Sequence, residues 1–423
     1  MRWLASCMAS RTEREALGPH AQAVSVNGHP NGEDDALGSG LGPTGSVRLR
    51  PLTRASSLRR TFGHYRRYSG YLPLAVEPRR ASAYVGWVGE RNVGDDAMHQ
   101  AHRTELPHLD LRPVPNVGTA QLPRVLQRSG LYQPRSLCLG GGTLIGNGFF
   151  GNTLENWLQA APDAPRFMLG VGVEDPRFGG RRGTATAKEL KRWVALLQEF
   201  PVVRVRGPLS RQVLADVGIS STVSGDPALL LGDPCPSPAR STGLLGLNVG
   251  VCDDLWGGNL SDVLCRLREF ARDQVRRGWR VRLFPFSNKD RAVCRQVADY
   301  VGAGTTVYGG FRDVPRLLEA LRECQVFVGL KLHSVVLATT VFVPSVAIEY
   351  LPKCRDFQAS IGREDWTIRS DQVDLDRLRE LTQLTTTDQE RQRYELDRAV
   401  RARRQELLAA SAGIRSSEVP GAT

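Results

Sequence analysis

From Ser82 onward, short apolar runs alternate with segments of helical periodicity, and this alternation constrains the fold more than any other feature of the sequence. Apolar runs joined by amphipathic helices are typical of parallel βαβ units, in which each helix returns the chain to the start of the next strand. Leu260–Arg277 shows the helical part clearly, because its apolar residues recur at three and four positions and predict one buried face. We therefore expect an α/β fold. The expected strands are Ala83–Val88, Leu109–Val114, Ser136–Leu139, Arg166–Val171, Val202–Val205, Leu244–Val251, Arg280–Phe284, Val326–Leu330 and Pro344–Ile348. The expected helices are Ala187–Phe200, Leu209–Val217, Leu260–Arg277, Val314–Arg322 and Val335–Thr340.

The Pro- and Ser-rich stretch Gly232–Thr242 divides these elements into two series. We expect an N-terminal α/β domain over residues 81–235 and a C-terminal α/β domain over residues 241–370, with a ligand cleft between them. Residues 371–412 are strongly charged and of helical character. They predict a C-terminal helix, Leu375–Leu408, that lies back across the body, with Thr385–Thr387 as a weak interruption.

Residues 1–80 differ from the rest of the chain in charge. They hold twelve Arg and six Asp or Glu, and so carry half of the net charge of +12. This composition predicts a basic, mostly disordered leader that is able to touch an anionic membrane surface. The body has no basic stripe with interleaved aromatic residues, so we do not expect nucleic acid as a partner.

The sequence shows no signal that directs the chain into or across a membrane. Only three residues precede the tetrad Leu4–Cys7, so it lacks the apolar core that a lipoprotein signal needs. The eight cysteines include no CxxC pair, which argues against structural zinc and against a disulfide framework. We expect a cytoplasmic protein that needs neither a metal nor a cofactor.

Two glycine-rich turns follow expected strands. The first, Gly86–Asp96, is neither a GxGxxG nor a P-loop motif. Its Asn92 and Asp95 are candidates to face a ligand, with Asp95 and Asp96 as acids favoured in the first turn of a helix as the alternative. The second contains Gly140, Gly141 and Gly142, where bare backbone suits either a ligand-facing turn or a tight crossing between domains.

Two segments place cations at the ends of expected strands. Arg206 precedes Gly207 and Pro208, so that a guanidinium and a helix N-terminus are both available to an anion. The run Lys331-Leu332-His333 follows a buried strand, and a buried Lys without a partner is costly, so Lys331 should face an anion. We interpret His333 as an acid or base, with a satisfied core histidine as the alternative. The remaining candidates, His99, His102 and His108, we expect on a solvated helix face or, in the case of His99 and His102, as a less favoured metal pair.

Taken in order, these segments resemble the polysaccharide pyruvyl transferase family. The matching pieces are Gly89–Asp96, Gly140–Gly142, Val205–Ser210, Asp226–Leu230, Lys331–Ser334 and Tyr350–Lys353. The resemblance covers roughly residues 83–360 and implies two Rossmann-like domains arranged as in the GT-B glycosyltransferases.

The resemblance also implies an activity, the transfer of pyruvate from phosphoenolpyruvate to a sugar of a glycan as a ketal, with release of phosphate. Arg206, Lys331 and Leu332 are then expected to bind phosphoenolpyruvate, His333 to be catalytic, and the acceptor or cleft side to be formed by Asn92, Asp95, Gly141 and Gly142. Members of the family commonly have Arg where this chain has Lys331, and the two side chains are not interchangeable at a forked anion site. A GT-B nucleotide-sugar glycosyltransferase and a non-catalytic glycan-binding relative remain the alternatives.

Overall fold

The computed structural model describes residues 81–89, 92–114, 134–178, 183–233, 242–252, 254–257 and 259–417. The chain divides into two compact units, Met1–His64 and Tyr65–Thr423, and every described residue belongs to the second unit. The expected leader over residues 1–80 lies outside the described residues, as does most of the stretch expected to join the two α/β domains.

The first half of the described chain forms two parallel four-stranded sheets, with strand orders β2-β1-β3-β5 and β4-β6-β7-β8. Strand β3 leads into β4 through Gly140 and Gly141, and β5 leads into β6 through Leu169 and Gly170, so the second sheet follows directly from the first. The strands are β1 (Ser82–Val85), β2 (Leu111–Pro113), β3 (Leu137–Leu139), β4 (Gly142–Ile145), β5 (Arg166–Met168), β6 (Val171–Val173), β7 (Arg204–Val205) and β8 (Thr222–Val223). The helices are α5 (Val93–Glu105), α7 (Gly148–Ala160), α8 (Gly183–Leu197) and α9 (Pro208–Ala215).

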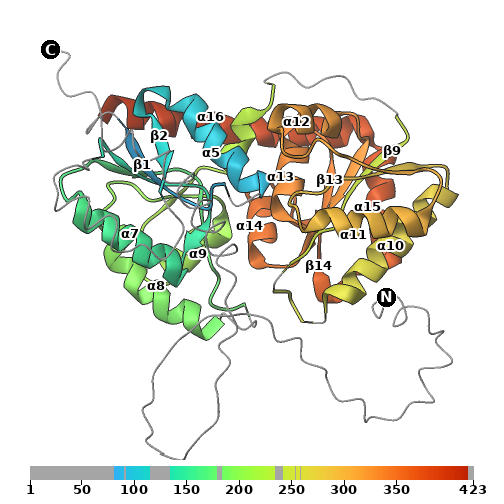
Figure 1. The fold of residues 1–423 in the computed structure, drawn as a ribbon, viewed down its shortest axis with the longest axis horizontal. Coiled ribbons are helices and arrows are strands. Elements are labelled where there is room, and N and C mark those ends of the chain that lie inside the picture. The colour runs from blue at the N-terminus through green and yellow to red at the C-terminus, as the bar shows by residue number, and fades with distance from the viewer. Residues whose placement is uncertain are drawn as a thin grey trace, which may run out of the picture. The chain divides into compact units, whose positions relative to one another are not determined.

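The second half forms one parallel six-stranded sheet with the order β11-β10-β9-β12-β13-β14. Every residue of three of its four inner strands, β9, β12 and β13, is buried, which explains their continuous apolar sequences. The strands are β9 (Leu244–Asn248), β10 (Arg280–Leu283), β11 (Thr305–Val307), β12 (Val326–Gly329), β13 (Ser345–Glu349) and β14 (Thr367–Arg369). The helices are α10 (Leu260–Arg276), α11 (Asp290–Val301), α12 (Val314–Arg322), α13 (Leu332–Thr340) and α14 (Pro352–Ser360), most of which are labelled in Figure 1.

Helix α5 joins the two halves. It follows β1 in the first half, yet its residues Val93, Ala97 and Met98 belong to the large apolar cluster built around the six-stranded sheet. A short 3-10 helix, Pro227–Leu231, adds Ala228 and Leu229 to the same cluster. The N-terminus of α5 is thereby held against the second half, where α13 begins.

The C-terminal segment forms two helices rather than one. Helix α15 (Leu375–Thr387) ends at Asp388, and α16 (Gln389–Ser417) continues as far as the described chain does. Helix α16 crosses both halves (Figure 1). Arg404 donates hydrogen bonds to the carbonyl groups of Leu229 and Thr340 in the second half, and Arg415 donates to the carbonyl of Glu105 at the end of α5. The expectation of a helix that lies back across the body is confirmed, with a later end and a break at Asp388.

Several local expectations were wrong. Helices α7, α11 and α14 and strands β4, β8, β11 and β14 were not predicted, and β4 begins inside the glycine run that we expected to be only a turn. The solvated face expected for the helix histidines is wrong for His102, which is fully buried with its ring nitrogens on the carbonyl oxygens of Met98 and Leu169. No helix among the described residues is long and apolar enough to cross a membrane.

Candidate functional site

A cavity of about 210 Å³ lies where the predicted motifs meet. It is bounded by the start of α5, the glycine turn between β3 and β4, the end of β7, and the starts of α13 and α14. We call it the basic cavity because three cationic side chains line it. Its lining residues are Asn92, Asp95, Gly142, Thr143, Arg206, Val251, Cys252, Asp254, Phe286, Lys331, Leu332, His333, Tyr350, Leu351 and Lys353.

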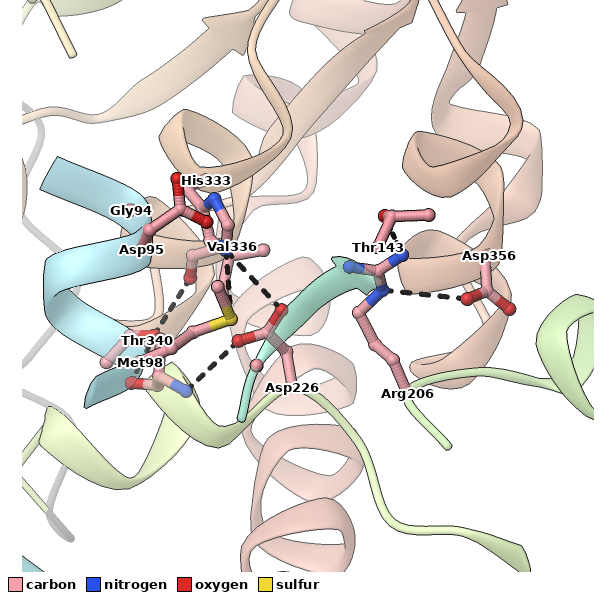
Figure 2. A network of polar contacts seen from close by, with 12 residues as sticks. Gly94, Asp95, Met98, Thr143, Arg206, Asp226, His333, Val336, Thr340 and Asp356 are labelled. Carbon is pink, nitrogen blue, oxygen red and sulfur yellow. Dashed lines mark hydrogen bonds and ion pairs between the residues drawn. The ribbon is translucent and has the colours of Figure 1, made fainter. Parts of the chain in front are cut away.

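Arg206 is fully buried at the wall of the basic cavity. Its Nη2 donates to Thr143 Oγ1 at 3.2 Å, and its Nε lies 3.5 Å from Asp356 Oδ2 (Figure 2). Neither its Nε nor its Nη1 has a hydrogen-bond partner in the part of the chain that the structure describes. Because an unpaired buried donor is costly, this guanidinium is poised to donate to an anion in the cavity.

The N-terminus of α9 is occupied by a side chain of the protein itself. Asp356 accepts hydrogen bonds from the backbone N–H and the hydroxyl of Ser210, at 3.0 and 2.7 Å. Gly207 is needed for this approach, because a Cβ there would lie 2.2 Å from the carbonyl oxygen of Asp356. The helix terminus that we expected to receive a ligand anion instead binds Asp356, which comes from α14 in the second half.

Lys331 is held by an internal carboxylate. Its Nζ lies 3.1 Å from Asp290 Oδ1 and donates to Ser287 Oγ at 3.1 Å. Asp290 is fully buried and also accepts from the backbone N–H groups of Val251 and Phe286. The ammonium group therefore lines the cavity with part of its charge already offset.

His333 is buried in the first turn of α13. Its Nε2 lies 3.4 Å from Met98 Sδ and 3.7 Å from Asp226 Oδ2, as Figure 2 shows. On its other side the ring packs against Gly94, where a Cβ would lie 2.1 Å from the ring carbon Cγ. Burial lowers the pKa of His333 well below its usual value, and the charges of Arg206, Lys353 and Lys331 lower it further.

Asp226 is the acidic neighbour of His333. Its Oδ1 caps the short 3-10 helix by accepting from the N–H of Ala228, whereas its Oδ2 has no hydrogen-bond partner. Burial raises the pKa of Asp226 to about 6, although the positive charge of Arg206 opposes the shift. Sequence reasoning recognised this segment only as part of the family resemblance and gave Asp226 no role.

Asn92 and Asp95 form the start of α5. Asn92 is the N-cap residue, whose Oδ1 accepts from the N–H of Gly94 and whose amide donates to Asp95 Oδ2. Asp95 is buried, and burial raises its pKa to about 7. These residues therefore begin the helix and also line the cavity, and their contact with a ligand stays a prediction.

The glycine run brings backbone close to its neighbours. Gly142 lines the cavity with φ of +108°, a conformation that other residues rarely adopt. Gly141 does not line it; its N–H donates to the Tyr84 hydroxyl, and a Cβ would lie 2.4 Å from Met98 Sδ. Gly142 thus borders the cavity, where contact with a ligand stays a prediction, and Gly141 packs tightly against Tyr84 and Met98, within its own half of the chain.

Lys353 is a site residue to which sequence reasoning assigned no role. It lies in the first turn of α14 and lines the basic cavity, with its Nζ 4.9 Å from the centroid of the Tyr350 ring. Burial lowers the pKa of Lys353, and the charge of Arg206 acts in the same direction. The sequence could have identified Lys353 as it identified Lys331, because both are cations that lie within a few residues of the end of a buried strand.

A second cavity, of about 320 Å³, adjoins the basic cavity. The two share Asn92, Asp95, Gly142, Thr143, Leu351 and Lys353. The remaining walls of the second cavity come from the first half of the chain, from Trp87, Leu144, Asn147, Phe150, Val173, Glu174, Asp175, Phe178 and Thr186, with Pro352 beside Lys353. Within the described ranges, no group of His, Cys, Asp and Glu side chains is arranged to hold a metal ion.

Two parallel α/β halves and a cavity at the ends of their strands define the class of protein as GT-B-like, which confirms the expected fold. A putative UDP-N-acetylglucosamine 2-epimerase from Listeria monocytogenes is similar in fold, with a TM-score of 0.50 and 11% identity over 76% of this chain and 91% of that one. A Thermobaculum terrenum O-GlcNAc transferase is also similar, with a TM-score of 0.43 and 14% identity over 81% of this chain and 67% of that one.

The family follows from the sequence. The family model of polysaccharide pyruvyl transferases matches residues 92–352, which include every segment on which the resemblance rests except the beginning of the first turn and Lys353. No curated protein matches the chain significantly. The protein belongs to the polysaccharide pyruvyl transferase family.

Proposed function

We propose that this protein transfers pyruvate from phosphoenolpyruvate to two hydroxyls of a sugar unit, which forms a ketal and releases phosphate. The observation that carries the proposal is Arg206, a fully buried guanidinium whose Nε and Nη1 have no hydrogen-bond partner among the described residues, beside a cavity also lined by Lys331 and Lys353. Phosphoenolpyruvate carries a carboxylate and a phosphate, so its binding requires several cations at close range.

The donor is expected to lie with its charged groups toward these three cations. Arg206 is able to bind a carboxylate or phosphate with its fork, whereas the ammonium groups of Lys331 and Lys353 supply point charges. Leu332, which lines the same cavity, offers apolar contact to the methylene group of the donor. This arrangement makes Lys353 as important for donor binding as Lys331, because no described side chain forms an ion pair with it.

His333 is proposed to move the proton. In the free protein burial and three neighbouring cations lower its pKa. A bound phosphoenolpyruvate offsets these cations, so the pKa of His333 rises when the donor binds and the imidazole gains a proton. Protonated His333 then delivers that proton to the methylene carbon, and Asp226 at 3.7 Å stabilises the imidazolium during the step.

The atoms balance as follows. Protonation turns the methylene group into a methyl group and makes the adjacent carbon electrophilic. One acceptor hydroxyl adds to that carbon, the bond between the carbon and the bridging oxygen breaks, and phosphate leaves with that oxygen. The second hydroxyl closes the ketal. Two hydroxyl protons are lost in total, and they balance the proton gained by the methyl group and the one taken up by phosphate.

Asp95 is proposed to serve the acceptor side. It lines both cavities, and its pKa of about 7 allows it to accept a hydroxyl proton near neutral pH. Asn92 hydrogen-bonds to Asp95 and fixes its orientation, and Gly142 leaves room for a sugar ring beside it. Gly141 contributes indirectly, by holding the turn against Tyr84.

The proposal is tested by incubating the protein with a panel of glycosides and either phosphoenolpyruvate or UDP- and GDP-sugars. We expect release of phosphate from phosphoenolpyruvate and a new methyl signal of the ketal in the proton NMR spectrum of the glycoside. Release of a nucleoside diphosphate would instead support a glycosyltransferase. Tight binding of phosphoenolpyruvate without turnover on any acceptor would support a non-catalytic relative.

A further inference from the structure

The second cavity differs from the basic cavity in both charge and shape. Its charged lining consists of the carboxylates of Asp95, Glu174 and Asp175 and the cation Lys353, and Asp175 is also paired with Arg177, whose Nε lies 3.0 Å from Asp175 Oδ1. The basic cavity has Arg206, Lys331 and Lys353 against two carboxylates, those of Asp95 and Asp254. Like charges in a confined, partly desolvated space repel strongly, so an anionic ligand favours the basic cavity over the second one.

One wall of the second cavity is aromatic. Trp87 is 39% exposed, although its ring packs edge-on against Phe149 and Phe150 at centroid distances of 6.1 and 6.0 Å. Phe178, on another part of the wall, packs edge-on against Trp256 at 4.8 Å. An indole that is fixed by its neighbours yet exposed at a cavity presents a flat apolar surface, which suits the C–H face of a pyranose ring.

Polar side chains of the second cavity are placed to receive hydroxyl groups. Glu174 accepts from the amide of Asn147 at 3.3 Å through one oxygen and from the hydroxyl of Thr186 at 3.1 Å through the other. Each carboxylate oxygen can accept more than one hydrogen bond, so Glu174 is both fixed in position and able to accept from a ligand hydroxyl. Asn147 is itself fixed, because its Oδ1 accepts from the N–H groups of Phe149 and Phe150.

We propose that the second cavity binds one uncharged pyranose unit of the acceptor, stacked on Trp87 with a hydroxyl donated to Glu174, and that its acidic lining excludes rings bearing a carboxylate. This inference rests on the proposed function, in which the adjoining basic cavity holds phosphoenolpyruvate. The shared residues Asn92, Asp95 and Gly142 bring the reacting hydroxyls of such a ring to the boundary between the two cavities. A volume of about 320 Å³ lies at the small end of ligand pockets and suits a single sugar ring.

The test is saturation-transfer NMR with the full chain and a panel of methyl glycosides. The probes are methyl gluco-, galacto- and mannopyranoside, the matching methyl glucuronide and galacturonide, and methyl 6-deoxygalactopyranoside. The last probe lacks the 6-hydroxyl group, as the uronides do, but carries no charge. We expect signals from at least one neutral hexoside, with weaker but clear signals from the 6-deoxy sugar, and at least fivefold smaller signals from the uronides.

Two variants locate the binding, each with a matched control. Trp87→Phe should reduce the hexoside signal at least fivefold, whereas Trp279→Phe, outside both cavities, should not change it. Glu174→Gln should weaken the neutral hexoside and strengthen the uronide, so that the ratio of the two signals falls at least fivefold. Glu155→Gln, on the outer part of α7, should leave that ratio unchanged. Melting temperatures of all four variants identify any that fold poorly.

Four results would overturn the inference: uronides that bind as well as hexosides, a hexoside signal insensitive to Trp87→Phe, no signal from any hexoside, or, with UDP as an additional probe, a UDP signal that is lost in Trp87→Phe. Binding of phosphoenolpyruvate is measured on the same samples by calorimetry and tests the proposed function separately. Hexoside binding without phosphoenolpyruvate binding would reject the donor but keep this subsite. UDP signals that depend on Trp87 would assign the aromatic wall to a nucleotide base and reject the subsite.

Discussion

Replacement of Lys331 by Met separates two roles that the structure gives this ammonium group. Lys331 is paired with Asp290 at 3.1 Å, and the side chain of Asp290 is fully buried. Breaking a buried ion pair by removing one partner costs about 3–5 kcal/mol. Asp290 keeps its hydrogen bonds from the backbone N–H groups of Val251 and Phe286, and Lys331 is partly exposed. We therefore expect Lys331→Met to lower the free energy of unfolding by less than that, about 2 kcal/mol.

The same variant should also lose affinity for phosphoenolpyruvate. A charge-assisted contact contributes about 1.5–3 kcal/mol, so the dissociation constant measured by calorimetry should rise by roughly 10- to 100-fold at a temperature where the variant is folded. Lys331→Arg keeps the charge and should retain most of both stability and affinity. Urea unfolding measures the first effect and calorimetry the second. A Lys331→Met protein that is less stable but binds phosphoenolpyruvate like the wild type would show that Lys331 serves only Asp290.

Four further outcomes follow from the site. His333→Ala should lower turnover by about 10²–10⁴ while phosphoenolpyruvate binding stays within a few-fold, provided that circular dichroism shows a folded protein, and normal turnover would move the acid to Asp95 or Glu349. Gly94→Ala introduces a Cβ 2.1 Å from the His333 ring and should reduce turnover at least tenfold, whereas Gly309→Ala, at a position with no neighbouring atoms within 4 Å, should leave turnover unchanged. Asp95 loses its proton above pH of about 7 and only then can accept a hydroxyl proton, so kcat/KM for the acceptor should rise as pH rises through about 7, and Asp95→Asn should abolish this limb of the profile. Removal of residues 1–80 should lower activity on a small acceptor less than tenfold relative to the full chain, a change of about 1.4 kcal/mol in the activation free energy. A larger loss would show that the leader contributes to the site.

The sequence was most informative where the chain is buried on both faces. Strands β9, β12 and β13 were found within two or three residues of their observed ends, because a fully covered strand must be continuously apolar. Strand β4 was missed because it begins at Gly142, and glycine has low strand propensity. Helix α11 was missed because its polar residues hide the few buried positions, among them Cys294 and Val297.

The cations of the site were predictable, whereas their partners were not. Arg206 and Lys331 follow strands, and that local pattern is visible in the sequence. Their carboxylate partners come from elsewhere: Asp356 lies on α14, in the other half of the chain from Arg206, and Asp290 begins α11. Only the folded chain brings these groups together. The sequence therefore predicted cations that line the cavity, but it did not predict that carboxylates of the protein offset part of their charge.

The lowered pKa of His333 could not be predicted from the sequence either. Its cause is burial against Gly94 and Met98 together with three cations, two of which, Arg206 and Lys353, lie in other segments of the chain. Under the proposed function, His333 therefore gains its proton only once the anionic donor is bound.

The fate of the bridging oxygen of phosphoenolpyruvate tests the central claim most directly. The protein is incubated with a glycoside acceptor and phosphoenolpyruvate that carries the heavy isotope of oxygen at the position joining carbon to phosphorus, and the released phosphate is examined by phosphorus NMR. Ketal formation breaks the carbon–oxygen bond, so we expect all of the label in phosphate and a glycoside that has gained the mass of pyruvate less one water. Unlabelled phosphate accompanied by free pyruvate would mean cleavage of the phosphorus–oxygen bond and would contradict pyruvyl transfer.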